Sequence, residues 1–480
     1  MSAQATLRKG VILALACAAQ FMVVLDVAIV NVALPSIQRD LDVGRSALQW
    51  IIIGYGLVLG GFLLLGGRLA DLLGRRRILL AGLALFSAAS LLAGLAGSAD
   101  VLIGARVLQG LGAALIPPAA LSILAVTFAD GAERNRAIGL YGAVTGVSAS
   151  VGVIASGLLT DGVGWHWIFL INVPIGVVLL ATAAVFLPTD EGGRREGEGF
   201  DVAGAVTVTG GLLLLVLGLS RTADVGWGSS STLASFAGAA LLLAVFAQVE
   251  RRSRTPLLPG AAVRNRTLVA ANLAAFTTFG AFFGFIFLGS LLMQQVLGYS
   301  PTRTGVAWLA TTATSFVAAA ITGGKLVAVL GVRRLLVAGQ ALLACSVLLL
   351  TRIPVDGSFA TDLLPALVLA GVAGGIAAPA AQIGALSGVT PALAGLASGL
   401  VETLRELGGA VGVAAVSTVL VSRTGLPAFH AAFWAICAVA AVGALVAAVG
   451  FPAGAGAGAG DAAAGPAPSA VPAAGGEARG

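Results

Sequence analysis

The sequence predicts an all-α membrane protein. Of its 480 residues, 58% are hydrophobic and only 10% are charged, whereas about a quarter of the residues in an ordinary soluble domain are charged. Apolar stretches of about 20 residues recur along nearly the whole chain, each long enough to cross a ~30 Å hydrocarbon core as a helix. Helices are expected because lipid offers no hydrogen-bonding partner to the edge of a sheet.

The apolar stretches divide into fourteen predicted transmembrane helices, an even number that places both termini on one side. We place them at 11–34, 48–67, 78–97, 101–123, 137–160, 167–187, 202–220, 231–249, 268–293, 304–323, 334–352, 363–386, 396–420 and 428–450. Nineteen Lys and Arg residues lie in the segments on the side of the termini, and six lie opposite. Since basic residues stay inside the cell, both termini are expected in the cytoplasm. The net charge of +6 is thus a topology signal, not a nucleic-acid surface.

A basic loop motif occurs twice, with an offset of 257 residues. The first copy runs over 67–77 and the second over 324–334. A duplication of this kind is expected of a transporter that rocks one half against the other. We interpret both copies as gating loops that latch one state, although the charges also set topology. Their key residues are Gly67, Asp71, Gly74, Arg75, Arg76 and Arg77, and in the second copy Gly324, Gly331, Arg333 and Arg334, with Ala328 in place of the aspartate.

The repeat divides the chain into four parts. Residues 1–188 and 263–450 are each predicted to form a six-helix bundle, related by a pseudo-twofold repeat. Residues 189–262 hold two inserted transmembrane helices with cytoplasmic linkers. Residues 451–480 are rich in Ala, Gly and Pro, so they cannot bury enough apolar surface to offset the entropy of ordering. We expect this tail to be disordered and cytoplasmic.

Four further stretches carry recognisable motifs. They are Leu25–Pro35 (LDVAIVNVALP), Arg106–Gly112 (RVLQGLG), Trp165–Gly176 (WHWIFLINVPIG) and Gly395–Gly409. Together with the basic loop, they make residues 1–450 resemble the 14-helix drug:proton antiporter family of the major facilitator superfamily. The resemblance implies two bundles with a central cavity, and export of drugs in exchange for protons by alternating access.

One stretch departs from the family pattern. The fifth-helix motif of antiporters ends in Gly-Pro and paired glycines, whereas residues 152–157 read Gly-Val-Ile-Ala-Ser-Gly. This difference keeps open a uniporter or importer of a specific metabolite. A non-transporting membrane receptor or scaffold is the remaining alternative, but it predicts a folded module outside the membrane, for which the sequence has no segment.

Two ionisable residues, Asp26 and Arg106, are expected at similar depth in helices that, by the family resemblance, line the cavity. Ionisable groups inside a membrane cost about 2.5–3.5 kcal/mol each on insertion scales, so they usually have a role. Burial favours the neutral form of a carboxyl group and a guanidinium favours the charged form. We therefore predict a proton- and substrate-sensitive pair. The alternative is a static ion pair that fixes helix packing.

A second set of ionisable residues lies in the thirteenth predicted helix. Glu402 and Glu406 are one turn apart and share a helix face, with Arg405 beside both. Either acid could carry an additional proton or select cationic substrates. A packing cluster satisfied by Arg405 is the alternative.

Neutral polar residues within the apolar helices are candidates for the cavity wall. They are Gln20, Asn31, Gln109, Thr145, Asn272, Gln294 and Gln382. A largely apolar pocket with few polar groups suits hydrophobic or amphipathic organic compounds, such as drugs, antibiotics or related metabolites.

Other function classes find no support in the sequence. No phosphate-binding loop of the Gly-x-x-x-x-Gly-Lys-Ser/Thr type is present, so a proton gradient is the expected energy source and no cofactor is expected. No metal-ligand spacing and no nucleophile–base pair suggests an enzyme. The use of arginine over lysine, with abundant Ala and Gly, indicates a GC-rich bacterial genome. We therefore expect a multi-pass protein of the bacterial cytoplasmic (inner) membrane, monomeric, with small organic molecules, protons and the lipid bilayer as partners and room for an adaptor protein.

Overall fold

The computed structural model describes residues 3–42, 45–189, 201–253, 255–355, 357–421 and 425–451, and within them all regular structure is helical. The first seven helices are α1 (Ala3–Asp40), α2 (Arg45–Leu73), α3 (Arg75–Gly94), α4 (Ala99–Thr127), α5 (Ala132–Gly162), α6 (Trp167–Leu170) and α7 (Asn172–Phe186). The middle of the chain forms α8 (Val202–Val225), α9 (Ser230–Arg252) and α10 (Gly260–Arg264). The remaining elements are α11 (Arg266–Leu291), η1 (Leu292–Val296), α12 (Pro301–Ile321), η2 (Thr322–Leu326), α13 (Val327–Leu350), η3 (Phe359–Leu363), α14 (Leu364–Leu386), η4 (Pro391–Leu393), α15 (Ala394–Val421) and α16 (Leu426–Gly450).

Twelve helical segments of the described residues are long and apolar enough to cross a membrane. One of them, Thr302–Leu350, has 49 residues and comprises all but the first residue of α12, together with the whole of η2 and α13. At 1.5 Å per residue, it is more than twice as long as a ~30 Å hydrocarbon core requires. The predicted class of an all-α, multi-span membrane protein is confirmed.

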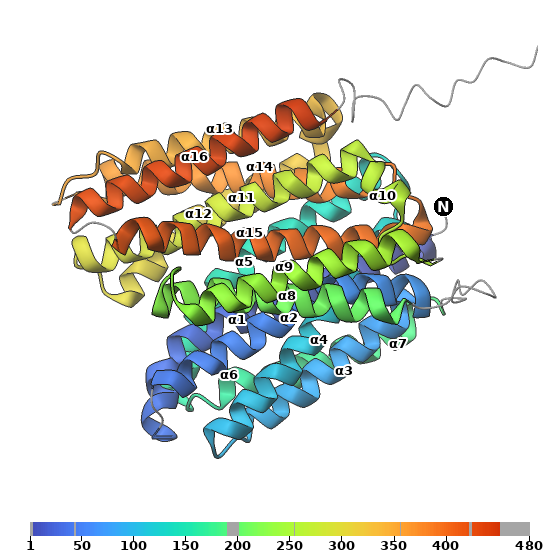
Figure 1. The fold of residues 1–480 in the computed structure, drawn as a ribbon, viewed down its shortest axis with the longest axis horizontal. Coiled ribbons are helices and arrows are strands. Elements are labelled where there is room, and N and C mark those ends of the chain that lie inside the picture. Colours follow the sequence, from blue (N-terminus) through green and yellow to red (C-terminus); the bar gives the residue numbers. More distant parts are fainter. Residues whose placement is uncertain are drawn as a thin grey trace, which may run out of the picture.

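The helices form two bundles with a hairpin beside them (Figure 1). In the first bundle, α1 packs on α5, and α4 packs on α2 and α3. In the second, α11 packs on α15 and α16, and α13 packs on α14 and α16. The hairpin of α8 and α9 lies along the boundary, where α8 contacts α2 of the first bundle and α15 of the second. Residues 190–200 of the predicted linker region and residues 452–480 of the predicted tail lie outside the described residues.

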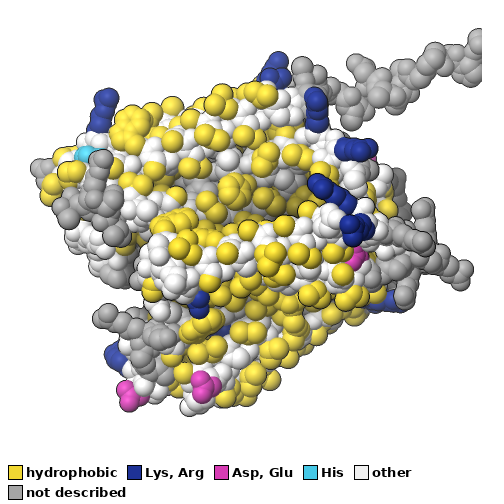
Figure 2. All heavy atoms as spheres, in the orientation of Figure 1, with side chains coloured by type: hydrophobic (Ala, Val, Ile, Leu, Met, Phe, Trp, Pro, Cys, Tyr) yellow, Lys and Arg dark blue, Asp and Glu magenta, His cyan; other side chains and the backbone are white. Residues whose placement is uncertain are grey.

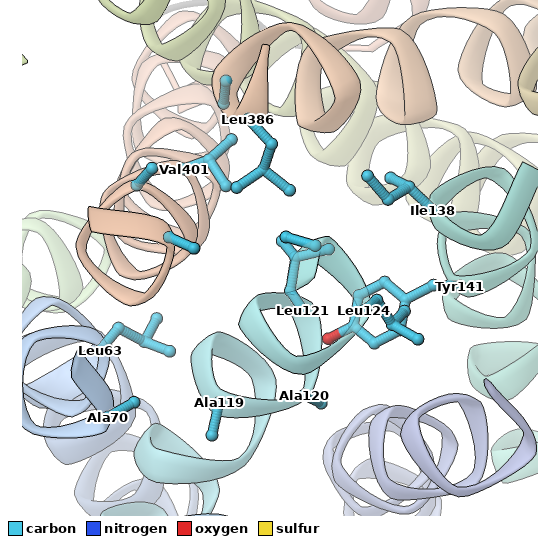
Figure 3. Close-up of a cluster of buried hydrophobic side chains, with 14 of the residues drawn as sticks. Leu63, Ala70, Ala119, Ala120, Leu121, Leu124, Ile138, Tyr141, Leu386 and Val401 are labelled. Atoms are coloured by element: carbon cyan, nitrogen blue, oxygen red, sulfur yellow. The ribbon is translucent and has the colours of Figure 1, made fainter. Parts of the chain in front are cut away.

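The boundary between the bundles is itself a packed apolar core. Figure 3 shows Leu63 on α2, Leu121 on α4 and Ile138 on α5 facing Leu386 on α14 and Val401 on α15. These side chains belong to one continuous buried cluster. Contacts of this kind bring both bundles together at the end of the molecule that holds Lys9, Arg75–Arg77 and Lys325, which we call the basic end. Basic side chains are most frequent at this end in Figure 2, and hydrophobic side chains cover the middle.

The two basic loops share one backbone feature. Gly74 has φ 99° and Gly331, at the repeat offset, has φ 73°, which is a conformation that glycine adopts without a steric penalty. The break that the sequence predicted between 323 and 334 is confined to Gly331, whose backbone is non-helical, and the helices on either side extend further into the loop than predicted. Thr322–Leu326 continues α12 as a π-helical turn, and Gly331 kinks α13.

Candidate functional site

Asp26 lies at the centre of a polar cluster inside the first bundle. Its Oδ2 is 2.5 Å from Arg106 Nη1 of α4, and its Oδ1 accepts hydrogen bonds from Gln109 Nε2 at 2.7 Å and Asn172 Nδ2 at 3.0 Å. All four side chains are buried. Charge-assisted hydrogen bonds are stronger than neutral ones, so this arrangement stabilises an ionised carboxylate where water does not reach.

Arg106 connects this cluster to α2. Its Nε donates to the Ile51 carbonyl oxygen at 3.2 Å, and its Nη1 also donates to Gln109 Oε1 at 2.6 Å. The guanidinium lies over the Tyr55 ring, 4.1 Å from its centroid, in a cation–π arrangement. Asp26 and Arg106, predicted to be close, therefore meet within a network that ties α1, α2, α4 and α7 together.

A second polar cluster lies in the other bundle. Arg405 is between the two acids of α15, with Nη1 2.7 Å from Glu402 Oε2 and Nη2 2.8 Å from Glu406 Oε1. Gln382 of α14 donates from Nε2 to Glu402 Oε1 at 3.2 Å. Glu402 is fully buried, whereas the side chain of Glu406 is 31% exposed. The structure therefore brings the three predicted residues of α15 together with one predicted cavity residue.

A cavity lies beside the second cluster, and the space free of protein atoms within it and its open mouth amounts to about 1200 Å³. Arg405, Gln382, Thr145 and Thr278 contribute polar groups to its wall. The rest is mostly apolar, with the aromatic side chains Phe279, Phe282, Phe283 and Trp308. Such a wall suits a bulky apolar molecule with few polar groups.

The other predicted cavity residues have varied positions. Gln20 is buried away from the cavity wall and accepts a hydrogen bond from the Tyr141 hydroxyl at 2.8 Å. Asn272 donates to the Leu268 carbonyl oxygen of its own helix. Gln294 is exposed in η1 and is not among the residues that line the cavity described above. The backbone of Asn31 is helical, and its side chain lies outside the described part.

Asp71 of the first basic loop reaches the other bundle. Its Oδ1 accepts a hydrogen bond from Gly395 N at 2.8 Å and its Oδ2 accepts one from Leu396 N at 2.7 Å. These are free N–H groups in the first turn of α15, where a negative charge is stabilised by the helix dipole. Arg75 also donates to the Pro391 carbonyl oxygen and to Ser122 Oγ. Arg76 donates to Ala184 of α7, within the first bundle.

Glycines permit close contact between the bundles at the basic end. A Cβ atom on Gly67 would lie 2.2 Å from the Gly395 carbonyl oxygen, and one on Gly323 would lie 2.6 Å from Gly139 Cα. The contact of α2 with α15 and that of α5 with η2 are thus both close backbone contacts at glycines. They lie at equivalent places in the two halves of the repeat. Gly324, which the sequence suggested for the second loop, has open space around it. Its neighbour Gly323 makes the contact.

Sequence reasoning missed several residues of the two clusters. Asn172 hydrogen-bonds Asp26, Ser90 Oγ accepts a hydrogen bond from Gln109, and Tyr141 lies near Glu402 and Arg405. Each is a polar side chain within an apolar run, and buried polar groups need partners. That rule could have selected Asn172, the sole amide of the run 167–187.

Taken together, the fold and the site define a multi-pass membrane protein with two helical bundles, a closed basic end and an apolar cavity beside buried charges. Comparison with known families gives the same class: residues 16–413 and 271–473 match the Major Facilitator Superfamily. The chain belongs to this superfamily of transporters.

Curated relatives are exporters and resistance proteins of bacteria. The puromycin resistance protein pur8 of Streptomyces alboniger is 39% identical over 412 residues, covering 85% of this chain and 81% of the relative. The cephamycin export protein CmcT of Amycolatopsis lactamdurans is 38% identical over 421 residues, covering 87% and 86%. Among solved structures, the human organic anion transporter MFSD10 (TETRAN) superposes with a TM-score of 0.68 at 15% identity, over 92% of this chain and 99% of that one. This likeness concerns the fold.

Proposed function

We propose that the protein exports hydrophobic or amphipathic organic compounds, such as antibiotics, in exchange for protons by alternating access. The observation that carries this proposal is the pairing of an apolar cavity with buried carboxylates next to it and within the adjoining bundle. The resistance and export proteins among the relatives support this class of cargo.

The Asp26–Arg106 pair supplies a physical basis for coupling. Three donors from α4 and α7 hold the carboxylate in its charged form. A proton can bind Asp26 at low cost only when these donors withdraw, because burial of a charge without partners is expensive. Protonation of Asp26 and separation of α1 from α4 and α7 are therefore linked. Through this link, the conformation of the bundle determines whether Asp26 binds a proton.

The basic end is the gate of the proposed cycle. The capping of α15 by Asp71 and the two glycine contacts close the cavity on that side. We assign the basic end to the cytoplasm, which places both termini inside. The state described by the structure is then the one in which the cytoplasmic path is shut.

We also propose fourteen membrane crossings. Thr302–Leu350 is long enough for two, and α5 has 31 residues with a predicted span at 137–160. Counting α12 and α13 separately and adding α5 to the apolar segments gives this number. The pair α8 and α9 is then the insertion between two six-helix bundles.

A uniporter or importer is the second candidate, favoured only by the altered motif at 152–157. Gly152 nevertheless packs closely against α1, where a Cβ atom would lie 2.8 Å from that of Ala28. The altered motif thus still makes a close contact between α5 and α1 without the proline.

Inverted membrane vesicles with an acidified lumen test the proposal. Addition of puromycin, or of another member of an antibiotic panel chosen by susceptibility tests in a pump-deficient host, should release protons from the lumen. Asp26→Asn should abolish this release while the protein stays in the membrane, and Asp100→Asn, at an exposed position of α4, should not. Cargo movement without proton release would support the uniporter, and undiminished exchange in Asp26→Asn would reject the proposed role of the pair.

A further inference from the structure

The two buried clusters differ in their balance of charge. Asp26 faces Arg106 as one acid and one base, and neutral amides complete its hydrogen bonds. On α15, by contrast, the single guanidinium of Arg405 lies between the two carboxylates of Glu402 and Glu406. When both acids are ionised, this cluster carries one negative charge in excess.

The surroundings of the cluster leave this charge uncompensated. The groups that face it from other helices are neutral: Gln382 from α14, Tyr141 from α5, Phe279 from α11 and Tyr55 from α2. Within the described residues, the charges that act on Glu402 are those of Arg405 and Glu406. Glu402 is fully buried and shares its one counter-charge with Glu406; because an incompletely compensated buried charge is costly, a proton or an external cation stabilises it.

Gln382 indicates what kind of cation fits. Its Nε2 faces Glu402, whose ionised carboxylate can only accept hydrogen bonds, and this fixes the orientation of the amide whenever Glu402 is charged. Its Oε1 is therefore an acceptor, and it is buried without a hydrogen-bond partner among the described groups. The residue is 4% exposed and lines the cavity. A ligand in the cavity that donates an N–H group to Oε1 would satisfy it.

The ion pair beside Gln382 also lacks hydrogen bonds at two of its atoms. Glu402 Oε2 and Arg405 Nη1 are 2.7 Å apart but are not aligned for a hydrogen bond. Both atoms are buried, so each retains unused hydrogen-bonding capacity. An ammonium group near Glu402 can therefore interact with its carboxylate without breaking the contact of Arg405 with Glu406.

We propose that the cavity selects cargo with a protonated amine, which donates to Gln382 Oε1 and lies against Glu402, with its apolar body among Phe279, Phe282, Phe283 and Trp308. This deepens, and rests on, the proposed export function. The ammonium takes the place of the proton that otherwise neutralises the excess carboxylate. Binding of the amine thus releases one proton from the carboxylic acid of Glu402, and return of that proton to Glu402 displaces the amine.

Three matched probes test the N–H requirement on the purified full-length protein in nanodiscs. They are N,N-dimethyl-naphthylmethylamine, its N-methyl quaternary salt and the neutral naphthylmethyl methyl ether. Titration calorimetry gives the dissociation constants, and its repetition in buffers of different ionisation enthalpy gives the number of protons released. We expect the amine to bind at least about tenfold more tightly than either other probe, about 1.4 kcal/mol, with release of one proton.

Variants separate the roles of the two residues. Gln382→Met, which keeps the shape but removes the acceptor, should make the amine and the quaternary salt bind equally. Glu402→Gln should remove the proton release. Gln295→Leu, at an exposed position of η1, is the matched control and should bind like the unchanged protein. Should Gln382→Met fail to fold, the comparison of the three probes on the unchanged protein still decides whether binding requires an N–H group.

Equal binding of the amine and the quaternary salt to the unchanged protein, or a preserved preference in Gln382→Met, would overturn the inference. These results are distinct from failure of the export function. Proton-driven export of compounds other than amines, without amine binding, would leave the proposed function standing and remove the inference. Amine binding with proton release, but without transport under a gradient, would do the reverse.

Discussion

At the scale of single residues, the buried pair of Asp26 and Arg106 should dominate stability. Arg106→Leu would leave the carboxylate without its counter-charge, and breaking a buried pair from one side costs about 3–5 kcal/mol. The double variant with Asp26→Asn removes the orphaned charge and should recover much of that loss. Thermal unfolding of the four proteins in detergent measures the coupling. Strictly additive effects would show that the two side chains do not depend on each other.

A second residue-scale prediction concerns the basic end. Lys9 Nζ is 2.8 Å from Glu133 Oε1, and this hydrogen bond is the main cause that lowers the pKa of the Glu133 carboxyl group from its ordinary value. The stabilisation is therefore complete above the unfolded-state pKa and is lost as the pH falls through the lower folded-state value. The melting temperature of the unchanged protein relative to Glu133→Gln should be higher at neutral pH, with the difference fading in acid. A difference that does not change with pH would contradict this assignment.

The sequence was informative about charged residues and less so about their neutral partners. Asp26 and Arg106 stood out because ionisable groups are rare inside membrane helices. Asn172, Ser90 and Tyr141 did not, because neutral polar residues are common there and their role depends on how each helix is rotated. In helices that are apolar on every side, the periodicity carries little information about rotation.

At the scale of helices, the closed gate depends on glycine at the crossing of α2 and α15. Gly67→Ala would place a methyl group against the Gly395 carbonyl oxygen, whereas Gly56→Ala on the same helix meets open space. We expect Gly67→Ala to open the basic end and Gly56→Ala to leave it closed. Cysteines introduced into the cavity wall, in a protein without its native cysteines, should react faster with cytoplasmic thiol reagents in the first variant. Equal rates in the two variants would show that this contact does not hold the gate.

The second half offers a sharper comparison between adjacent residues. Gly323→Ala should disturb the contact with α5, and Gly324→Ala should not. The sequence alone placed this contact one residue away, at Gly324, because the repeat aligns that residue with Gly67. The π-helical turn Thr322–Leu326 contains both glycines, and a π-helical turn changes which residue faces a neighbouring helix. Such a turn leaves no clear mark in the hydrophobic pattern.

At the scale of the whole molecule, the proposed topology can be tested with reporter fusions. A fluorescent protein fused after residue 188 or 253 should fold in the cytoplasm, and alkaline phosphatase fused after residue 228, between α8 and α9, should be active outside. An inactive phosphatase at 228 would mean that α8 and α9 do not cross the membrane, and the count of fourteen would then fail.

Within the described residues, the hairpin of α8 and α9 contacts a helix of each bundle, α2 and α15, through α8. Against α2, Leu213 and Val216 of α8 rest on Gly60 and Gly61, a stretch of bare backbone with little to interlock. Against α15, Trp227 donates its indole N–H to the Thr418 hydroxyl. If the bundles rotate during transport, we expect the contact of α8 with Gly60 and Gly61 to slide and the hydrogen bond of Trp227 with Thr418 to persist. The hairpin would then move together with the second bundle and slide along α2 of the first. The side of the transporter that carries the hairpin would therefore move differently from the opposite side.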